Sequence, residues 1–171
     1  MITLAFYRGR GRLFDRFVRL WTRSAYSHVE LVERVVGYGE TATAWSSSPR
    51  DGGVRSKAIT FTADKWELVP VDWAPTDAPG RISLDAGAKY DWLGILLSQI
   101  LPIQWHSDDR WFCSEIIADV LDFPDPHTIS PGELKALVDF QHAELRKADL
   151  MIAKRIPKTK LKPKGAGHDE L

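Results

Sequence analysis

The stretch Arg110-Trp111-Phe112-Cys113-Ser114-Glu115-Ile116-Ile117-Ala118-Asp119-Val120-Leu121 holds the only cysteine of the 171-residue chain. After this cysteine the apolar residues recur at the spacing of one helix face: Ile116, Ile117, Val120 and Leu121. Ser114 and Glu115 suit the first turn of a helix. The pattern therefore predicts an amphipathic helix with Cys113 at its N-terminal end.

A cysteine at this position has two interpretations. The free N–H groups and the positive end of the helix dipole favour a thiolate, which is the nucleophile of papain-like hydrolases. Alternatively, Cys113 packs in the core as a small hydrophobic residue. The catalytic interpretation needs a base elsewhere in the chain.

His28 is the candidate base. The segment Tyr26–Glu33 alternates and carries β-branched residues, so it predicts a strand with His28 and Glu30 on the same face. A strand histidine that faces a helix-start cysteine forms a thiolate–imidazolium pair. The alternative for His28 is a structural histidine held by hydrogen bonds.

A third group would orient the imidazole, and several residues are candidates for this role. Glu30 is the first of them, although it could be an ordinary surface charge. The others lie on or after the next predicted strand: Thr43, Ser46 and Ser47.

The backbone N–H of Cys113 is the expected centre of an oxyanion hole. Four side chains are further candidates for substrate binding or oxyanion stabilisation: Tyr26, Ser46, Tyr90 and Ser114. The sequence contains no metal-ligand spacing, phosphate-binding loop or dinucleotide fingerprint. We therefore expect no metal and no cofactor.

The remaining pattern predicts an α+β domain with an antiparallel sheet packed against helices. Strands are expected at 2–7, 26–33, 40–45, 54–60 and 66–71. Helices are expected at 13–21, 82–89, 92–101, 113–121 and 130–140, the last beginning with a capping box at Ser130.

Composition and charge divide the chain into a domain at 1–153 and a basic, flexible tail at 154–171. Six of the 23 basic and two of the 23 acidic residues lie in the tail, which leaves 17 basic and 21 acidic residues in the body. A slightly acidic body argues against a broad nucleic-acid-binding face. The tail either keeps the protein in solution or binds an anionic surface.

Three features of the sequence bear on cellular location. The N-terminus lacks the pattern of a signal peptide, and the longest apolar run, 92–97, is too short to cross a bilayer. One cysteine excludes an internal disulfide. These features predict a cytoplasmic protein without a transmembrane segment.

Three motifs resemble the circularly permuted branch of the NlpC-type papain-like hydrolases, which includes the YiiX-like bacterial proteins and the lecithin retinol acyltransferase group. The motifs are Ser27-His28-Val29-Glu30-Leu31-Val32, Lys89-Tyr90-Asp91-Trp92-Leu93-Gly94 and Trp111-Phe112-Cys113-Ser114-Glu115. In permuted members the histidine strand precedes the cysteine helix, as it does here. The resemblance covers residues 1–140 and implies a permuted papain-like fold, with Cys113 as nucleophile and His28 as base.

The loop 46–55 also resembles small stand-alone members encoded in bacteriophage and prophage genomes. The resemblance implies a cysteine hydrolase acting on amide bonds of peptidoglycan peptides. A phage-borne enzyme of this kind would be virion-associated, with virion proteins as partners. Two alternatives remain. One is a lipid-directed acyl hydrolase or acyltransferase, and the other is a non-catalytic virion or tail component on the same fold.

Overall fold

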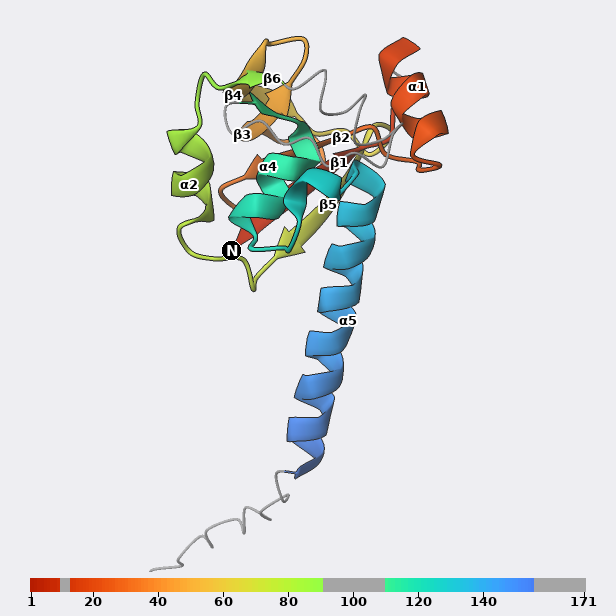
Figure 1. Cartoon of the computed structure of the whole chain (residues 1–171). Helices are drawn as coiled ribbons and strands as arrows, with labels where there is room; N and C mark the ends of the chain where they lie inside the picture. Colours follow the sequence, from red (N-terminus) through yellow and green to blue (C-terminus); the bar gives the residue numbers. More distant parts are fainter. Residues whose placement is uncertain (10–12, 91–109, 156–171) are drawn as a thin grey trace, which may run out of the picture. The chain divides into compact units, whose positions relative to one another are not determined.

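The computed structural model describes residues 1–9, 13–90 and 110–155 (Figure 1). The predicted helix at 92–101 and all but the first two residues of the predicted tail lie outside the described residues. The chain divides into two compact units, Met1–Leu137 and Val138–Leu171.

A mixed sheet forms the centre of the first unit. Its five long strands are β1 (Ile2–Tyr7), β2 (His28–Val32), β3 (Thr41–Ser48), β4 (Gly53–Thr60) and β5 (Trp66–Val71). The order across the sheet is β5-β1-β2-β3-β4-β6-β7, and neighbours among the five long strands are antiparallel. The short strands β6 (Lys89–Tyr90) and β7 (Arg110–Trp111) extend it, β7 running parallel to β6. The expected α+β class with an antiparallel sheet is confirmed.

The sequence of β1 is a nearly continuous apolar run because both faces of this strand are buried. Residues 2–6 are all buried, so side chains on both faces of this strand are covered. One face belongs to a core cluster that includes Ala5, Val32, Ala44 and Trp66. Phe6 and Leu31, on the other face, are also fully buried.

The predicted helix at 82–89 is wrong in its position. Helix α2 (Ala78–Leu84) begins earlier, with Pro79 in its first turn, where proline's missing N–H costs nothing. Gly87 then adopts φ 93°, a left-handed conformation that ends helices. Lys89 belongs to β6, which approaches so close to Gly53 that a side chain there would overlap the Ala88 carbonyl.

Helix α4 (Cys113–Val120) begins where the sequence predicts. The Glu115 carboxylate accepts a hydrogen bond from the Phe112 N–H at 3.2 Å, which holds the first turn. Helix α4 buries side chains that include Ile116 and Ile117, and it contacts β2, β3 and α2. The remaining elements in the described part of the first unit are helix α1 (Leu13–Trp21), the 3-10 turn η1 (Pro126–Thr128) and the start of α5.

Helix α5 (Pro131–Arg155) begins at the predicted capping box, where Ser130 and Glu133 exchange hydrogen bonds of 2.8 and 3.3 Å. It is longer than predicted because residues 141–155 contain no glycine or proline to end it. The predicted domain boundary at 153/154 therefore falls inside a helix, whereas the compact units divide at 137/138.

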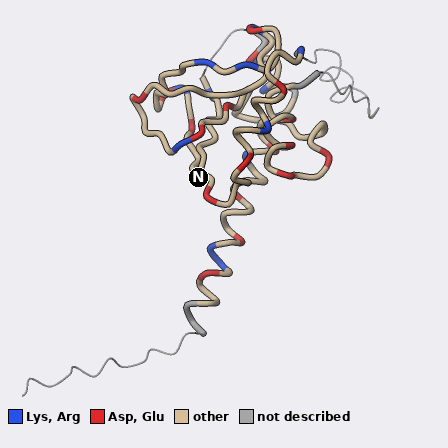
Figure 2. The backbone as a smooth tube through the Cα atoms, turned by 90° about the vertical axis from the view of Figure 1, so that its left-hand side faces the viewer, with Lys and Arg blue, Asp and Glu red and all other residues tan. Residues whose placement is uncertain are grey.

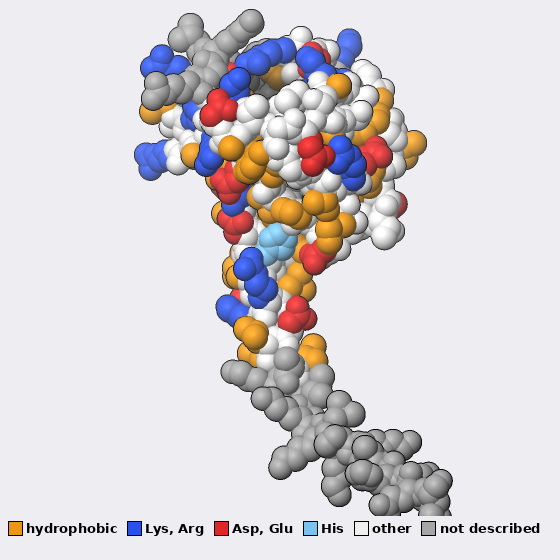
Figure 3. Space-filling model, turned by 180° about the vertical axis from the view of Figure 1, so that it is seen from behind, with side chains coloured by type: hydrophobic (Ala, Val, Ile, Leu, Met, Phe, Trp, Pro, Cys, Tyr) orange, Lys and Arg blue, Asp and Glu red, His pale blue; other side chains and the backbone are white. Residues whose placement is uncertain are grey.

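The described part of the second unit is the helical segment 138–155. Apolar side chains are exposed along it among charged ones (Figure 3): Phe140, Leu145, Leu150, Met151 and Ile152. Over the described chain as a whole, residues of both charge signs are scattered along the backbone (Figure 2). Of the helices described, none has the length and apolar character needed to cross a membrane.

Candidate active site

His28 and Glu30 lie on the same face of β2, as the alternation predicts. His28 Nε2 is 2.8 Å from Glu30 Oε1, a hydrogen-bonding distance. The imidazole is 18% exposed, whereas the carboxylate is only 1% exposed. Glu30 is therefore the member of the third-residue candidates that contacts the imidazole, and it is a buried acid rather than a surface charge.

Cys113 is buried at the first position of α4, and its side chain interacts electrostatically with the imidazole of His28. Because Nε2 of His28 is already bonded to Glu30, Nδ1 is the ring nitrogen left for the sulfur. Residues far apart in the sequence thus form a continuous chain of contacts, from Cys113 through His28 to Glu30. The N–H of Cys113 has no acceptor within its own helix because it belongs to the first turn.

Arg55 compensates the buried charge of Glu30. Its two terminal nitrogens donate hydrogen bonds of 2.7 and 2.6 Å to the two carboxylate oxygens. Arg55 Nε donates a third bond, of 2.8 Å, to Asp51. A bidentate pair of this kind fixes the orientation of the carboxylate as well as its charge.

A small residue between the two strands allows this pair to form. Arg55 on β4 is paired with Ser46 on β3, and continuing the β2–β3 register places Ser46 opposite Glu30. The Ser46 hydroxyl donates to the Val29 carbonyl at 2.7 Å, so this short side chain is engaged with the neighbouring strand. The arginine side chain can therefore cross β3 and reach the glutamate.

The electrostatics of the site favour the charged forms of Glu30 and His28. Burial opposes ionisation of Glu30, but hydrogen bonds from Arg55 and His28 outweigh it and lower the pKa of the carboxyl. Burial likewise opposes the imidazolium, yet the adjacent Cys113 and Glu30 raise the pKa of His28 to about 10. His28 is thus expected to carry a proton at neutral pH.

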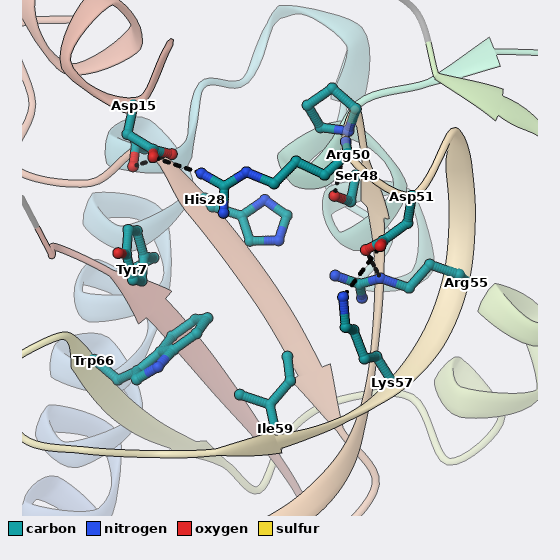
Figure 4. A pocket seen from close by; sticks show the side chains of 12 residues that line it. Tyr7, Asp15, His28, Ser48, Arg50, Asp51, Arg55, Lys57, Ile59 and Trp66 are labelled. Carbon is teal, nitrogen blue, oxygen red and sulfur yellow. Dashed lines mark hydrogen bonds and ion pairs between the residues drawn. The ribbon is translucent and has the colours of Figure 1, made fainter. Parts of the chain in front are cut away.

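A pocket of about 190 Å³ opens beside His28 (Figure 4). Tyr7, Ile59 and Trp66 line one part of it, and charged side chains from the β3–β4 hairpin line another. Those charged side chains are Arg50, Asp51, Arg55 and Lys57. His28 lines this pocket and also interacts with Cys113, so the ring connects the pocket to the cysteine.

The other side chains proposed from the sequence lie in different surroundings. Ser114 is buried and donates to the Ile129 carbonyl at 2.6 Å. The Tyr26 hydroxyl donates to Glu67 at 2.5 Å, and burial together with this acid raises the pKa of Tyr26 to about 12. Tyr90 is described only as a strand residue of β6, so its predicted role stays a prediction.

Arg55 and the hairpin cations are the site residues that the sequence did not single out. A buried glutamate needs a cation as its partner. This requirement could have led to a search for an arginine or lysine on the strands that follow Glu30 in the sequence. Among described residues, no group of histidine, cysteine and acidic side chains is arranged to hold a metal ion.

Comparison with known proteins identifies no family. No protein-family model matches the chain, and no curated protein matches its sequence.

Proposed function

We propose that this protein is a cysteine hydrolase that cleaves amide bonds, with Cys113 as nucleophile and His28 as base. One observation carries the proposal: His28 contacts the Cys113 side chain and Glu30 at the same time, at the N-terminus of a helix. Nucleophile, base and orienting acid within hydrogen-bond reach are what covalent catalysis requires.

In the proposed reaction the Cys113 thiolate attacks the carbonyl carbon of the amide. The oxyanion that forms accepts a hydrogen bond from the Cys113 N–H. The His28 imidazolium then donates its proton to the leaving nitrogen, the C–N bond breaks and a thioester remains. Neutral His28 next takes a proton from water, whose oxygen attacks the thioester, and the acid is released with the thiolate restored.

In this scheme Glu30 and Arg55 are positioning residues. Glu30 keeps Nε2 of the imidazole engaged, so that Nδ1 faces the sulfur. Arg55 keeps Glu30 ionised and oriented. The proposed fold is the permuted papain-like one, supported by a histidine strand that precedes the cysteine helix in the chain.

The proposed substrate is a peptide bond of bacterial peptidoglycan, which rests on the resemblance of the three motifs to permuted NlpC-type hydrolases. The test is incubation of the purified protein with peptidoglycan peptides, followed by detection of new amino groups and of product masses. Native protein should release them, and Cys113→Ala and His28→Ala should not.

Two other outcomes would replace this proposal. Release of fatty acid from phospholipid vesicles, without peptide cleavage, would assign the site to lipid chemistry. Binding to sacculi without any cleavage, unchanged in Cys113→Ala, would assign the protein to a structural role in a virion or on a cell wall.

A further inference from the structure

The pocket beside His28 is lined by charged residues of both signs. The cations are Arg50, Arg55, Lys57 and the imidazolium of His28, and the acids are Asp15 and Asp51, with Glu30 bonded to Arg55 and His28. Because Arg50, Arg55 and Lys57 are each paired with an acid, the number of charges alone does not set the preference of the pocket for a ligand.

The exposure of these charges is unequal. The side chains of Arg50 and Lys57 are 54% and 55% exposed. The acids bonded to them are far more covered, Asp15 at 8% and Asp51 at 26%. A ligand entering from solvent would thus meet the cationic ends first, with the acids behind them.

Donor capacity supports the same conclusion. The Lys57 ammonium has three donors and gives one to Asp51, at 3.1 Å. The Arg50 guanidinium has five and gives one to Asp15, at 2.7 Å. Both are anchored by an acid and retain N–H groups that can point into the pocket (Figure 4).

The opposite part of the lining is apolar and aromatic. The Tyr7 and Trp66 rings lie edge to face, with centroids 5.0 Å apart, and Ile59 of β4 lines the same pocket. Such a surface suits the aliphatic or aromatic part of a ligand.

We propose that this pocket is a specificity site for a carboxylate-bearing substrate. The carboxylate would bind Lys57 and Arg50, and an adjoining apolar group would pack against Trp66. Resting on the proposed function, this assigns the substrate class as acyl or peptidyl amides with a free carboxylate near the scissile bond.

The test compares two reagents that alkylate Cys113 and differ in charge, iodoacetate and iodoacetamide. Their rate ratio, relative to the ratio for 2-mercaptoethanol, measures the anion preference of the pocket. Because it is a ratio, it is insensitive to a general change in thiol reactivity. In low salt, native protein should favour iodoacetate, and Lys57→Gln should lower the ratio by about threefold, the effect of one nearby solvated charge. Arg50→Gln should act similarly.

Two control variants separate the pocket from the overall field of the protein. Lys57→Arg keeps the charge and should keep the ratio. Arg34→Gln removes a side chain that is also 55% exposed and paired with an acid, but at the other end of β2, and should leave the ratio unchanged.

Failure of this inference differs from failure of the catalytic proposal. Fast alkylation by both reagents at pH 6, with a ratio indifferent to Lys57 and Arg50, overturns the carboxylate site and leaves the hydrolase intact. Alkylation as slow as that of an ordinary thiol overturns the hydrolase and the substrate assignment together.

Discussion

Arg55 reaches across strand β3 to hold Glu30 by two hydrogen bonds, of 2.6 and 2.7 Å. Glu30 is 1% exposed and Arg55 is 16% exposed, so this ion pair lies largely out of water. It connects the β3–β4 hairpin to the histidine strand, and through Glu30 it orients the imidazole that contacts Cys113.

Removal of Arg55 should destabilise the fold strongly. Arg55→Met leaves a buried carboxylate without its cation, which costs about 3–5 kcal/mol in the free energy of unfolding. Denaturant unfolding measures this cost. The double variant Arg55→Met with Glu30→Leu should recover part of it, because the unpaired charge is gone.

Arg34→Met serves as the matched control for that experiment. Arg34 also bonds a glutamate, Glu40 at 2.9 Å, but both side chains are about half exposed. Such pairs contribute roughly 0–1 kcal/mol. If Arg55→Met lowers the free energy of unfolding no more than Arg34→Met does, the buried pair between Arg55 and Glu30 does not stabilise the fold.

Replacement of Glu30 by glutamine should lower the rate at which the Cys113 thiol is alkylated, without abolishing the reaction. Glu30→Gln removes the negative charge that helps to keep His28 protonated, so we expect alkylation of Cys113 by iodoacetamide at pH 6 to fall by about tenfold or more. The control is Glu33→Gln, which removes an exposed carboxylate bonded to the Trp45 ring N–H at 2.9 Å. Equal rates in Glu30→Gln and native protein would remove Glu30 from the site.

The same substitution should change the acid dependence of stability. Because the pKa of Glu30 is lowered by folding, its contribution is present above its ordinary value of 4.5 and is lost as pH falls through the folded-state pKa. The free energy of unfolding of native protein should therefore decline more steeply below pH 4.5 than that of Glu30→Gln. Parallel curves from denaturant unfolding at pH 2.5–6 would contradict the lowered pKa.

The titration of His28 should reveal its contact with Cys113 directly. Among the groups that raise the pKa of His28 to about 10, Cys113 contributes most. In Cys113→Ala the pKa of His28 should therefore fall. It should stay above the pKa of His28 in a double variant that lacks both Cys113 and the Glu30 carboxylate. Imidazole resonances followed by NMR from pH 5 to 11 report this. An identical titration in native protein and Cys113→Ala would mean that the two side chains do not interact.

Local patterns in the sequence were sufficient to predict part of this site. Alternation in 26–33 placed His28 and Glu30 on one face, and the apolar spacing after Cys113 placed the cysteine at a helix start. Both predictions depend only on the periodicity of one element, which neighbouring residues determine.

The contacts between elements could not be predicted in the same way. Arg55 meets Glu30 only because β3 separates their strands in one particular register, with Ser46 at the crossing point. Register depends on turns and on the whole sheet, and a shift by one residue would turn Arg55 to the opposite face. The error at 82–89 has a similar origin, because pairing with β4 draws Lys89 into the sheet.

The central claim, that Cys113 and His28 form a catalytic pair, is tested most directly by the pH dependence of iodoacetamide alkylation at Cys113. Native protein should react fast at about pH 6, well below the pKa of about 8.5 of a free cysteine. His28→Ala should react slowly there and reach its full rate only near that ordinary pKa, whereas His127→Ala should behave like native protein. A slow reaction in native protein that is indifferent to His28 would contradict the claim and identify Cys113 as a structural residue.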